Sequence, residues 1–302
     1  MNPDEKNAPL PGSPAPKAGF LLEDYRLFHL KKRPPSPCAP HYHGFCKVLL
    51  LLKGSIHYMI EGRSYELLPG DIVLVNRGEI HCPQPEAAQD YERVILYLSP
   101  AFLTSVSPEA PLNQCFVQAR YRHSSVLRLG EGRRSGIFAL AARLEESLCA
   151  PEAFASRLHC RLLLLELLIA LNRAALDSRS AYLQTGELNY QISGLLSYIN
   201  SHLDSDLSIR RLCEECCLSP SHLMHRFKAE TGCTIGCYIT QKRLALAREL
   251  LSSGHVNATQ ACFRSGFSSY SSFLRAYKRQ FGSPPVRTGG PVVSREEAAP
   301  LE

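Results

Sequence analysis

The sequence predicts an α+β protein in which an N-terminal antiparallel β-barrel, followed by helices, precedes an all-α domain of two similar helical units joined by a linker helix. Three observations predict this architecture. Short apolar runs separated by Gly-containing turns fill residues 25–98, and apolar residues recur at helical spacing after residue 135. A segment of roughly fifty residues is then repeated in the last third of the chain.

The composition excludes several classes of protein. The 302 residues include 45% hydrophobic and 21% charged side chains, which is ordinary for a globular chain and excludes extensive disorder. The longest apolar run, Leu162–Leu171, contains Glu166 and falls short of the ~18 residues of a membrane helix, and no signal peptide is visible. We therefore expect a cytoplasmic protein without a membrane partner, whose twelve cysteines are reduced and structural.

The first domain is expected at residues 20–176, after a flexible Pro-rich arm at residues 1–19. Its turns are expected at Gly54, Gly62, Gly70 and Gly78. Its strands are expected at Tyr25–Leu30, Cys46–Leu52, Ile56–Ile60, Ile72–Val75 and Val94–Leu98. Short strands at such close spacing are typical of an antiparallel sandwich or barrel.

Two helices are expected at the end of this domain, at Gly136–Ala150 and Ser156–Leu176. The second is Leu-rich around much of its circumference, so we expect it to be buried on more than one side, either within the chain or at a dimer interface. A polar linker at residues 177–187 leads to short helices at residues 188–287, and residues 288–302 are expected to form a disordered tail.

The positive charge is concentrated in the last third of the chain. Residues 207–287 contain twelve Lys and Arg against four Asp and Glu, a net charge of +8. The rest of the chain has 34 − 12 = 22 basic and 28 − 4 = 24 acidic residues, a net charge of −2. This asymmetry is typical of a nucleic-acid-binding module attached to a neutral partner domain, although a solvated basic surface would give the same count.

The repeat lies in this basic segment. Its landmarks are Cys213, Leu218, Phe227-Lys228 and Gly232 in the first copy and Cys262, Phe267, Tyr277-Lys278 and Gly282 in the second. Each copy reads as a short helix, a tight turn and a second helix, which is the pattern of a helix-turn-helix unit whose second helix enters the DNA major groove. Two helical hairpins that merely pack together are the alternative.

The repeat also predicts local details. We expect Ser219 and Ser268 to cap the second helices and the small residues Cys213 and Cys262 to lie where the two helices of each unit cross. The helix expected at Ile235–Leu251 would fix the distance between the units. Its exposed basic face is expected to consist of Lys242, Arg243 and Arg248.

Both copies resemble the helix-turn-helix units of AraC/XylS-type transcriptional regulators. The match runs from Leu207 to Gly232 for the first unit and from Cys262 to Gly282 for the second. The resemblance implies sequence-specific binding to double-stranded promoter DNA, often with activation through contact with RNA polymerase. We therefore expect a DNA-binding regulator that is not an enzyme, and we expect it to activate transcription.

The second helix of each unit supplies the expected DNA contacts. Bases are expected to face Ser221, Met224 and His225 in the first unit and Tyr270, Ser271, Leu274 and Arg275 in the second. Phosphates are expected to face Lys228, Lys278 and Arg279, with Ser219 and Ser269 completing the DNA-binding set. Arg275 is the strongest candidate for base reading, because Arg binds guanine O6 and N7 bidentately.

The N-terminal part resembles the cupin-like sensor domain of this family. The supporting residues include Pro40 through His43, the Pro69-Gly70-Asp71 turn and His81. The resemblance implies a small-molecule effector, with a sugar or related metabolite as one candidate. The expected effector-binding residues are His41, His43, Phe45, Tyr58 and His81.

These histidines also have the spacing that cupins use for a metal. The family pattern places a carboxylate four residues after the second histidine, but this chain has Lys47 there, whose ammonium would repel a cation. We therefore expect no metal and no cofactor. A metal-dependent cupin enzyme or a metal or redox sensor is the alternative function.

A run of cysteines in the first unit also raises the question of metal binding. Cys213, Cys216 and Cys217 lack a second pair at close spacing, so packing is favoured over a zinc or redox site, and Cys213 and Cys217 are expected to face the core.

In the mechanism that we expect, a homodimer formed through the helices at residues 136–176 binds the effector. The signal then crosses the linker to the DNA-binding domain.

Overall fold

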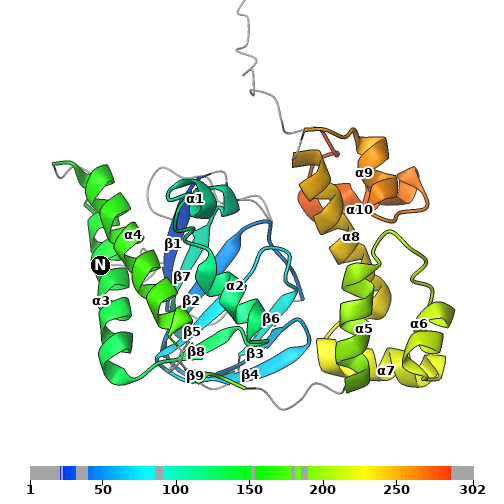
Figure 1. Ribbon diagram of the computed structural model, residues 1–302, viewed down its shortest axis with the longest axis horizontal. Coiled ribbons are helices and arrows are strands. Elements are labelled where there is room, and N and C mark those ends of the chain that lie inside the picture. Colours follow the sequence, from blue (N-terminus) through cyan, green and yellow to red (C-terminus); the bar gives the residue numbers. More distant parts are fainter. Residues whose placement is uncertain are drawn as a thin grey trace, which may run out of the picture.

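The computed structural model describes residues 21, 23–31, 40–85, 91–150, 154–177, 181–184, 190–252 and 254–286. Within these ranges, two β-sheets and four helices form one domain, and six further helices form a second domain beside it (Figure 1). The predicted N-terminal arm and C-terminal tail lie outside the described residues. None of the helices within these ranges is long and apolar enough to cross a membrane.

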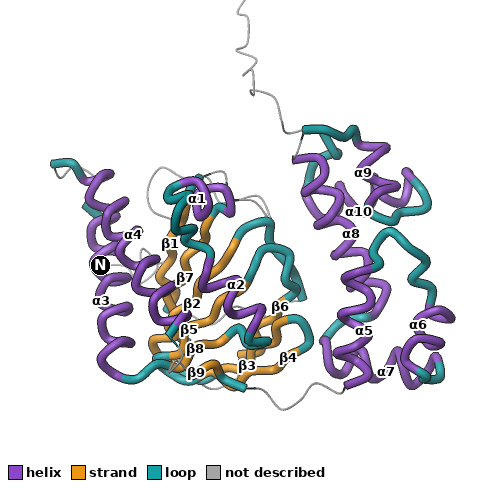
Figure 2. Tube along the Cα trace, in the orientation of Figure 1, coloured by secondary structure: helices purple, strands orange, loops and turns teal. Residues whose placement is uncertain are grey.

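Antiparallel strands form both sheets, as predicted. The six-stranded sheet has the order β1-β7-β2-β5-β8-β9, and the three-stranded sheet has the order β4-β3-β6. Their bounds are β1 Tyr25–Leu30, β2 Cys46–Lys53, β3 Ile56–Ile60, β4 Arg63–Leu67, β5 Asp71–Val75, β6 His81–Pro85, β7 Glu92–Leu98, β8 Val126–Arg128 and β9 Ala181–Tyr182. Figure 2 shows the strands gathered between helices on both sides.

Strand β2 shows how the sequence divides the core into two layers. Because side chains alternate along a strand, Val48 and Leu50 join the apolar cluster between the sheet and its covering helices. Leu49 and Leu51 point the other way, into the apolar cluster between the two sheets. The interior of this β-domain therefore lies between the six-stranded and three-stranded sheets.

The predicted glycine turns are confirmed. Gly54, Gly62, Gly70 and Gly78 all have positive φ angles. At Gly70 the φ angle is +96°, which favours glycine, and a Cβ atom there would have to displace the Arg134 side chain, which lies 2.5 Å away.

Helices cover the face of the six-stranded sheet that lies away from the second domain (Figure 1). They are α1 Pro100–Ser105, α2 Gln114–Tyr121, α3 Glu131–Leu148 and α4 Ser156–Leu176. Helix α4 has the predicted bounds, whereas α3 begins five residues before the predicted Gly136. The buried face of α4 includes Leu164 and Leu168, but Leu158 and Leu162 on its other face are more than half exposed.

Part of the predicted linker belongs to the sheet. Strand β9 pairs with β8 through Leu127 and Tyr182, and the Tyr182 hydroxyl donates to the Ala175 carbonyl at 3.0 Å. The remainder of the linker falls partly outside the described residues.

The second domain contains the predicted tandem units. Its helices are α5 Tyr190–Ser201, α6 Ile209–Cys216, α7 Pro220–Thr231, α8 Ile235–Ser252, α9 Ala258–Arg264 and α10 Tyr270–Phe281. Helices α6 and α7 form the first unit, α9 and α10 form the second, and α8 connects them. Leu223 and Phe227 of α7 and Phe273 and Tyr277 of α10 are buried and form the core faces of the two helices.

Two predicted details of the units are wrong. Helix α10 is capped by Ser269, whose hydroxyl accepts from the Ser272 amide, and not by Ser268. Cys217 does not face the core, because it adopts the left-handed conformation (φ 53°) that ends α6 and is exposed to solvent. Ser219 does occupy the N-cap of α7, but its side chain forms no capping hydrogen bond.

Candidate nucleic-acid interface and sensor site

The predicted DNA-contacting residues lie on the outer faces of α7 and α10 and at their N-caps. Eleven of the twelve are exposed, and only Leu274 is half-buried. Buried aromatic residues on the opposite face of each helix, such as Phe227 and Phe273, fix the orientation of the two contact surfaces. Gly232 and Gly282, both in the left-handed conformation, end the two helices at equivalent positions.

The first contact surface is concave. A groove of about 370 Å³ lies between α7 and the start of α8. Its lining includes Ser221, Met224, His225 and Lys228, together with Ile209 and the first residues of α8. The structure therefore brings four of the predicted DNA contacts of the first unit together around one hollow.

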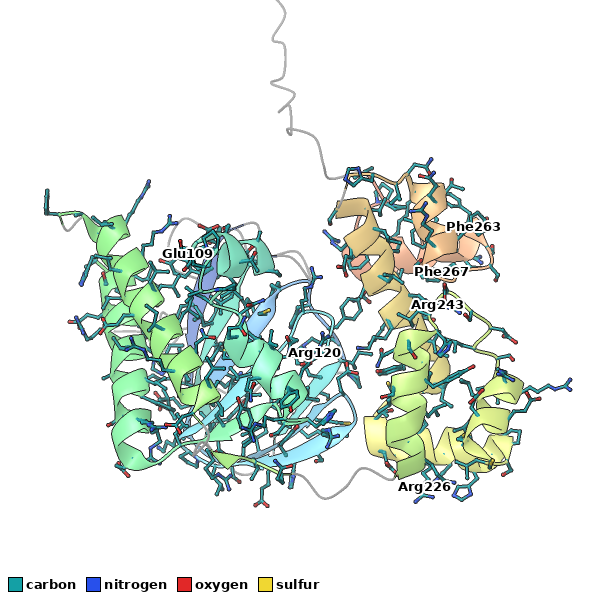
Figure 3. The ribbon with its side chains drawn as sticks, in the orientation of Figure 1. Glu109, Arg120, Arg226, Arg243, Phe263 and Phe267 are labelled. Atoms are coloured by element: carbon teal, nitrogen blue, oxygen red, sulfur yellow. The ribbon has the colours of Figure 1, made fainter. Side chains whose placement is uncertain are left out.

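Helix α8 does not present the exposed basic face that the sequence predicts. Lys242, Arg243 and Arg248 are all half-buried. The Arg243 Nε donates to the Leu203 carbonyl at 2.9 Å, and Arg243 thereby ties α8 to the loop before α6 (Figure 3). The Arg248 guanidinium lies 4.7 Å from the centre of the Phe281 ring. These cations hold the domain together and do not form a free DNA-facing surface.

Lys242 instead contacts the β-domain. Its ammonium donates to Glu61 Oε1 at 2.6 Å and to the Gly78 carbonyl at 3.0 Å. The Tyr238 hydroxyl of the same helix donates to Glu61 Oε2 at 2.6 Å. Glu61 itself lies in the turn between β3 and β4 with a φ of 47°, a conformation that non-glycine residues adopt rarely. Sequence reasoning predicted a turn at the neighbouring Gly62 and assigned no role to Glu61.

Two β-domain side chains are embedded in the core of the helical domain. Tyr42 and Ile80 are each 4% exposed and belong to the apolar cluster formed by α5–α10. The Tyr42 ring lies 6.5 Å from that of Phe281, at the end of α10. Desolvation by burial raises the pKa of the Tyr42 hydroxyl well above its ordinary value, and that oxygen has no hydrogen-bond partner in the described part of the chain.

The predicted effector-binding residues lie together in the β-domain. His41, His43 and His81, hereafter the histidine cluster, have ring centres 4.4–4.9 Å apart. The His43 ring stacks on Phe45 at 4.5 Å, and the His81 ring is parallel to Tyr58 at 6.1 Å. All five predicted residues thus contribute to one site at the edge of the β-domain nearest the helical domain.

Burial determines the charge of the histidine cluster. Desolvation, with a smaller contribution from the nearby Lys47 ammonium, lowers the pKa of His43 to about 2. The same two causes lower the pKa of His81 well below its ordinary value. Both imidazoles are therefore neutral at neutral pH. The Lys47 ammonium, which is also buried, donates to the Tyr58 hydroxyl at 2.9 Å.

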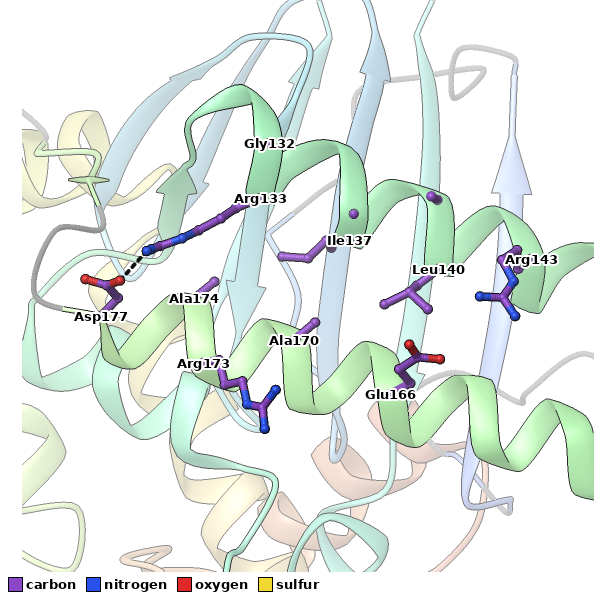
Figure 4. A pocket seen from close by; sticks show the side chains of 12 residues that line it. Gly132, Arg133, Ile137, Leu140, Arg143, Glu166, Ala170, Arg173, Ala174 and Asp177 are labelled. Carbon is purple, nitrogen blue, oxygen red and sulfur yellow. Dashed lines mark hydrogen bonds and ion pairs between the residues drawn. The ribbon is translucent and has the colours of Figure 1, made fainter.

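A second hollow lies on the far side of the β-domain. This groove of about 500 Å³ runs between α3 and α4, and Figure 4 shows side chains from both helices lining it. Its lining mixes apolar residues such as Leu140 and Ala170 with the Arg133–Asp177 ion pair. It is remote from both the histidine cluster and the contact surfaces of α7 and α10 (Figure 1).

Family comparisons match both domains. Residues 32–168 match the family model described as the AraC-like ligand binding domain, and residues 212–289 match the model described as a helix-turn-helix domain. Together, the two matches cover most of both domains.

The chain is also similar to curated relatives over most of its length. The chain is 24% identical over 269 residues to the HTH-type transcriptional activator RhaS of Citrobacter koseri, covering 85% of this chain and 90% of the relative. It is 24% identical over 256 residues to the HTH-type transcriptional activator RhaR of an Enterobacter species, covering 84% and 88%. Among solved structures, ToxT of Vibrio cholerae is similar at 15% identity with a TM-score of 0.36, covering 86% of this chain and 95% of ToxT.

Proposed function

The chain belongs to the AraC/XylS family of DNA-binding transcriptional regulators, and we propose that it binds promoter DNA with the exposed faces of α7 and α10. The β-domain is the effector-binding domain of this regulator. The observation that carries the proposal is the arrangement of the two units, since the same outward positions of α7 and α10 carry polar and basic side chains. We propose no catalytic step for either domain.

In this proposal the two second helices enter successive major-groove segments. Arg275 reads a guanine, while Lys228, Lys278 and Arg279 neutralise phosphates near the ends of the helices. Phosphate contacts make the affinity fall as the salt concentration rises, and the base contacts fix the sequence.

Selection of bound duplexes from a random pool by the full chain tests the proposal. We expect a site with two sequence blocks about one helical turn apart, because the two units bind one face of the duplex. A bound pool with one block, or with no sequence preference at any salt concentration, would contradict the tandem arrangement.

The effector is proposed to bind at the histidine cluster and its aromatic neighbours. Their position beside α8 supports this proposal, since a ligand there would lie close to the contact between the domains. Contact with RNA polymerase is proposed from family membership. An in vitro transcription assay on the selected promoter tests it, with activation as the expected outcome.

We propose that α3 and α4 form a homodimer interface. The exposed face of α4 carries Leu158, Leu162 and Ile169, which are 59%, 56% and 40% exposed, next to the groove between the two helices. Leu162→Glu should shift the full chain from dimer to monomer in sedimentation velocity. Substitution of the exposed Tyr121 on α2 by Glu is the control and should leave the dimer intact.

A further inference from the structure

The histidine cluster contains buried nitrogen atoms that no group in the described part of the chain satisfies. His81 is 1% exposed, and its Nδ1–H donates to the Glu79 carbonyl at 3.0 Å. Because a carbonyl can only accept, the lone pair of His81 is on Nε2, which is buried and has no hydrogen-bond partner among the described residues. Within the same described ranges, both ring nitrogens of His43 are also buried without a partner. Buried polar atoms are rarely left unsatisfied, so these nitrogens are candidate ligand-binding atoms.

The arrangement of these nitrogens suits a divalent transition-metal ion. One ring nitrogen from each histidine lies within 4.8 Å of the others. Zn–N bonds of about 2.0–2.1 Å place two tetrahedral ligand atoms about 3.4 Å apart, so shifts of about an ångström would close the cluster around an ion. The hydrogen bond from His81 Nδ1 to a backbone carbonyl is the outer contact that orients histidine ligands in metal sites.

The residues that alternate with these histidines enter the helical domain. His41 and His81 are joined by backbone hydrogen bonds of 3.1 and 2.8 Å, so the two segments are extended side by side. Successive side chains in an extended segment point to opposite sides. Tyr42 and Ile80 therefore lie in the helical core, while the neighbouring histidines face the β-domain. The Pro40 carbonyl of the first segment also accepts from Gln241 of α8 at 3.2 Å.

We propose that a divalent transition-metal ion bound by the histidine cluster regulates DNA binding, and that Tyr42 and Ile80 transmit the occupancy of the cluster to the helical domain. Closing the three imidazoles around an ion moves the backbone on which both of these side chains are carried. The proposed regulation of DNA binding rests on the proposed function of the chain, whereas the proposed metal site does not. The Lys47 ammonium keeps its charge while it donates to the Tyr58 hydroxyl, so it weakens cation binding at the cluster but does not occupy the histidine nitrogens.

Cobalt(II) titration of the tag-free, chelator-stripped full chain tests the site. We expect one Co²⁺ per chain, with d–d absorption of imidazole coordination, displacement by Zn²⁺, and no thiolate charge-transfer band. His43→Gln and His81→Gln should each abolish binding, whereas His57→Gln, which removes an exposed histidine on β3, should not. If His81→Gln fails to fold by circular dichroism, His43→Gln decides. Absence of binding, or binding that survives both cluster substitutions, overturns the site.

Fluorescence anisotropy with a selected duplex tests the regulation. We expect Co²⁺ or Zn²⁺ to change the Kd of the wild-type chain at least about fivefold, the lower end of typical coupling between sites. Tyr42→Ala should still bind cobalt but should respond less than twofold, and the exposed Tyr121→Ala should respond like the wild type. Equal DNA affinity with and without the ion overturns the regulation. If no duplex binds in either state, the proposed function and the regulation fail together, while the cobalt stoichiometry still decides the site.

Discussion

Replacing Glu61 with alanine is expected to weaken the contact between the two domains by about 2–3 kcal/mol. The Glu61 carboxylate accepts two hydrogen bonds of 2.6 Å across the contact, from Lys242 and from Tyr238 of α8, and a third from the Ile80 amide of its own domain. Hydrogen bonds to charged groups contribute about 1.5–3 kcal/mol each when buried. The sum is reduced here, because the Glu61 side chain is 22% exposed and Lys242 retains the Gly78 carbonyl.

Hydrogen exchange measures this effect at the contact itself. Peptides that cover residues 40–46 and 78–82 should exchange about 30–150 times faster in Glu61→Ala, since each 1.4 kcal/mol is a factor of ten. Glu249→Ala is the matched control. This substitution removes a second ion pair between the domains, which Glu249 forms with Arg77. The side chains of Arg77 and Glu249 are 51% and 56% exposed, so the loss of this ion pair should cost less than about 1 kcal/mol.

Equal effects of the two substitutions would refute this reasoning, as would faster exchange spread over the whole β-domain. Glu61→Gly adds a further check. Because Glu61 has a φ of 47°, glycine relieves the backbone strain and should recover about 1 kcal/mol relative to alanine without restoring the hydrogen bonds.

Three further predictions concern DNA reading, pH and packing. Arg275→Ala should lose about 1–3 kcal/mol of discrimination at one base pair, whereas Lys278→Ala should lower the affinity for all sequences alike and reduce the slope of log K against log[salt] by about one. Repeating the duplex selection with each variant tests this. Loss of the same sequences by both variants would contradict the assignment. Burial, with a smaller contribution from a neighbouring carboxylate, raises the pKa of Glu79 from 4.5 to about 7, so the folded chain binds this proton more tightly than the unfolded chain. Its stabilising contribution is present below pH 4.5 and lost as the pH rises to 7, and urea unfolding of Glu79→Gln should remove a decline of about 3 kcal/mol over that range. Gly266→Ala should lower the free energy of unfolding in urea by about 3 kcal/mol or more, because φ is +90° and the new Cβ would lie 1.8 Å from a backbone oxygen. Gly194→Ala is the control and should not destabilise the chain, because Gly194 in α5 has open space around it.

The sequence predicts the bounds of an element most accurately where the apolar pattern is local and its ends are marked by turns or polar segments. The bounds of β1, β3 and α4 agree with the predicted bounds, because each is a clear apolar run with a turn or polar segment on either side. Strands β4 and β6 were missed for different physical reasons. The first is short, with exposed residues at alternate positions, and the second carries Pro83 and Pro85, which argue against a strand in sequence reasoning.

The contact between the domains leaves no local signal. Glu61 and Lys242 are separated by 181 residues, and neither belongs to a motif. The predicted basic face of α8 is wrong for the same reason, since a period of 3.6 residues places Lys242 on a face without showing what covers that face. The histidine cluster was identified from His-x-His spacing, but the burial that leaves its nitrogens unsatisfied is visible only in three dimensions.

Helix α8 combines two tasks in one rigid element. Its 18 residues span about 27 Å, and they fix both the separation and the rotation of the second unit relative to the first. One inserted residue would rotate the second unit by about 100° and turn its contact surface away from the duplex. The length of α8 therefore limits the spacing of the sequence blocks that the protein can bind. A promoter that acquires one extra base pair between its two blocks cannot be matched by a small adjustment of the helix.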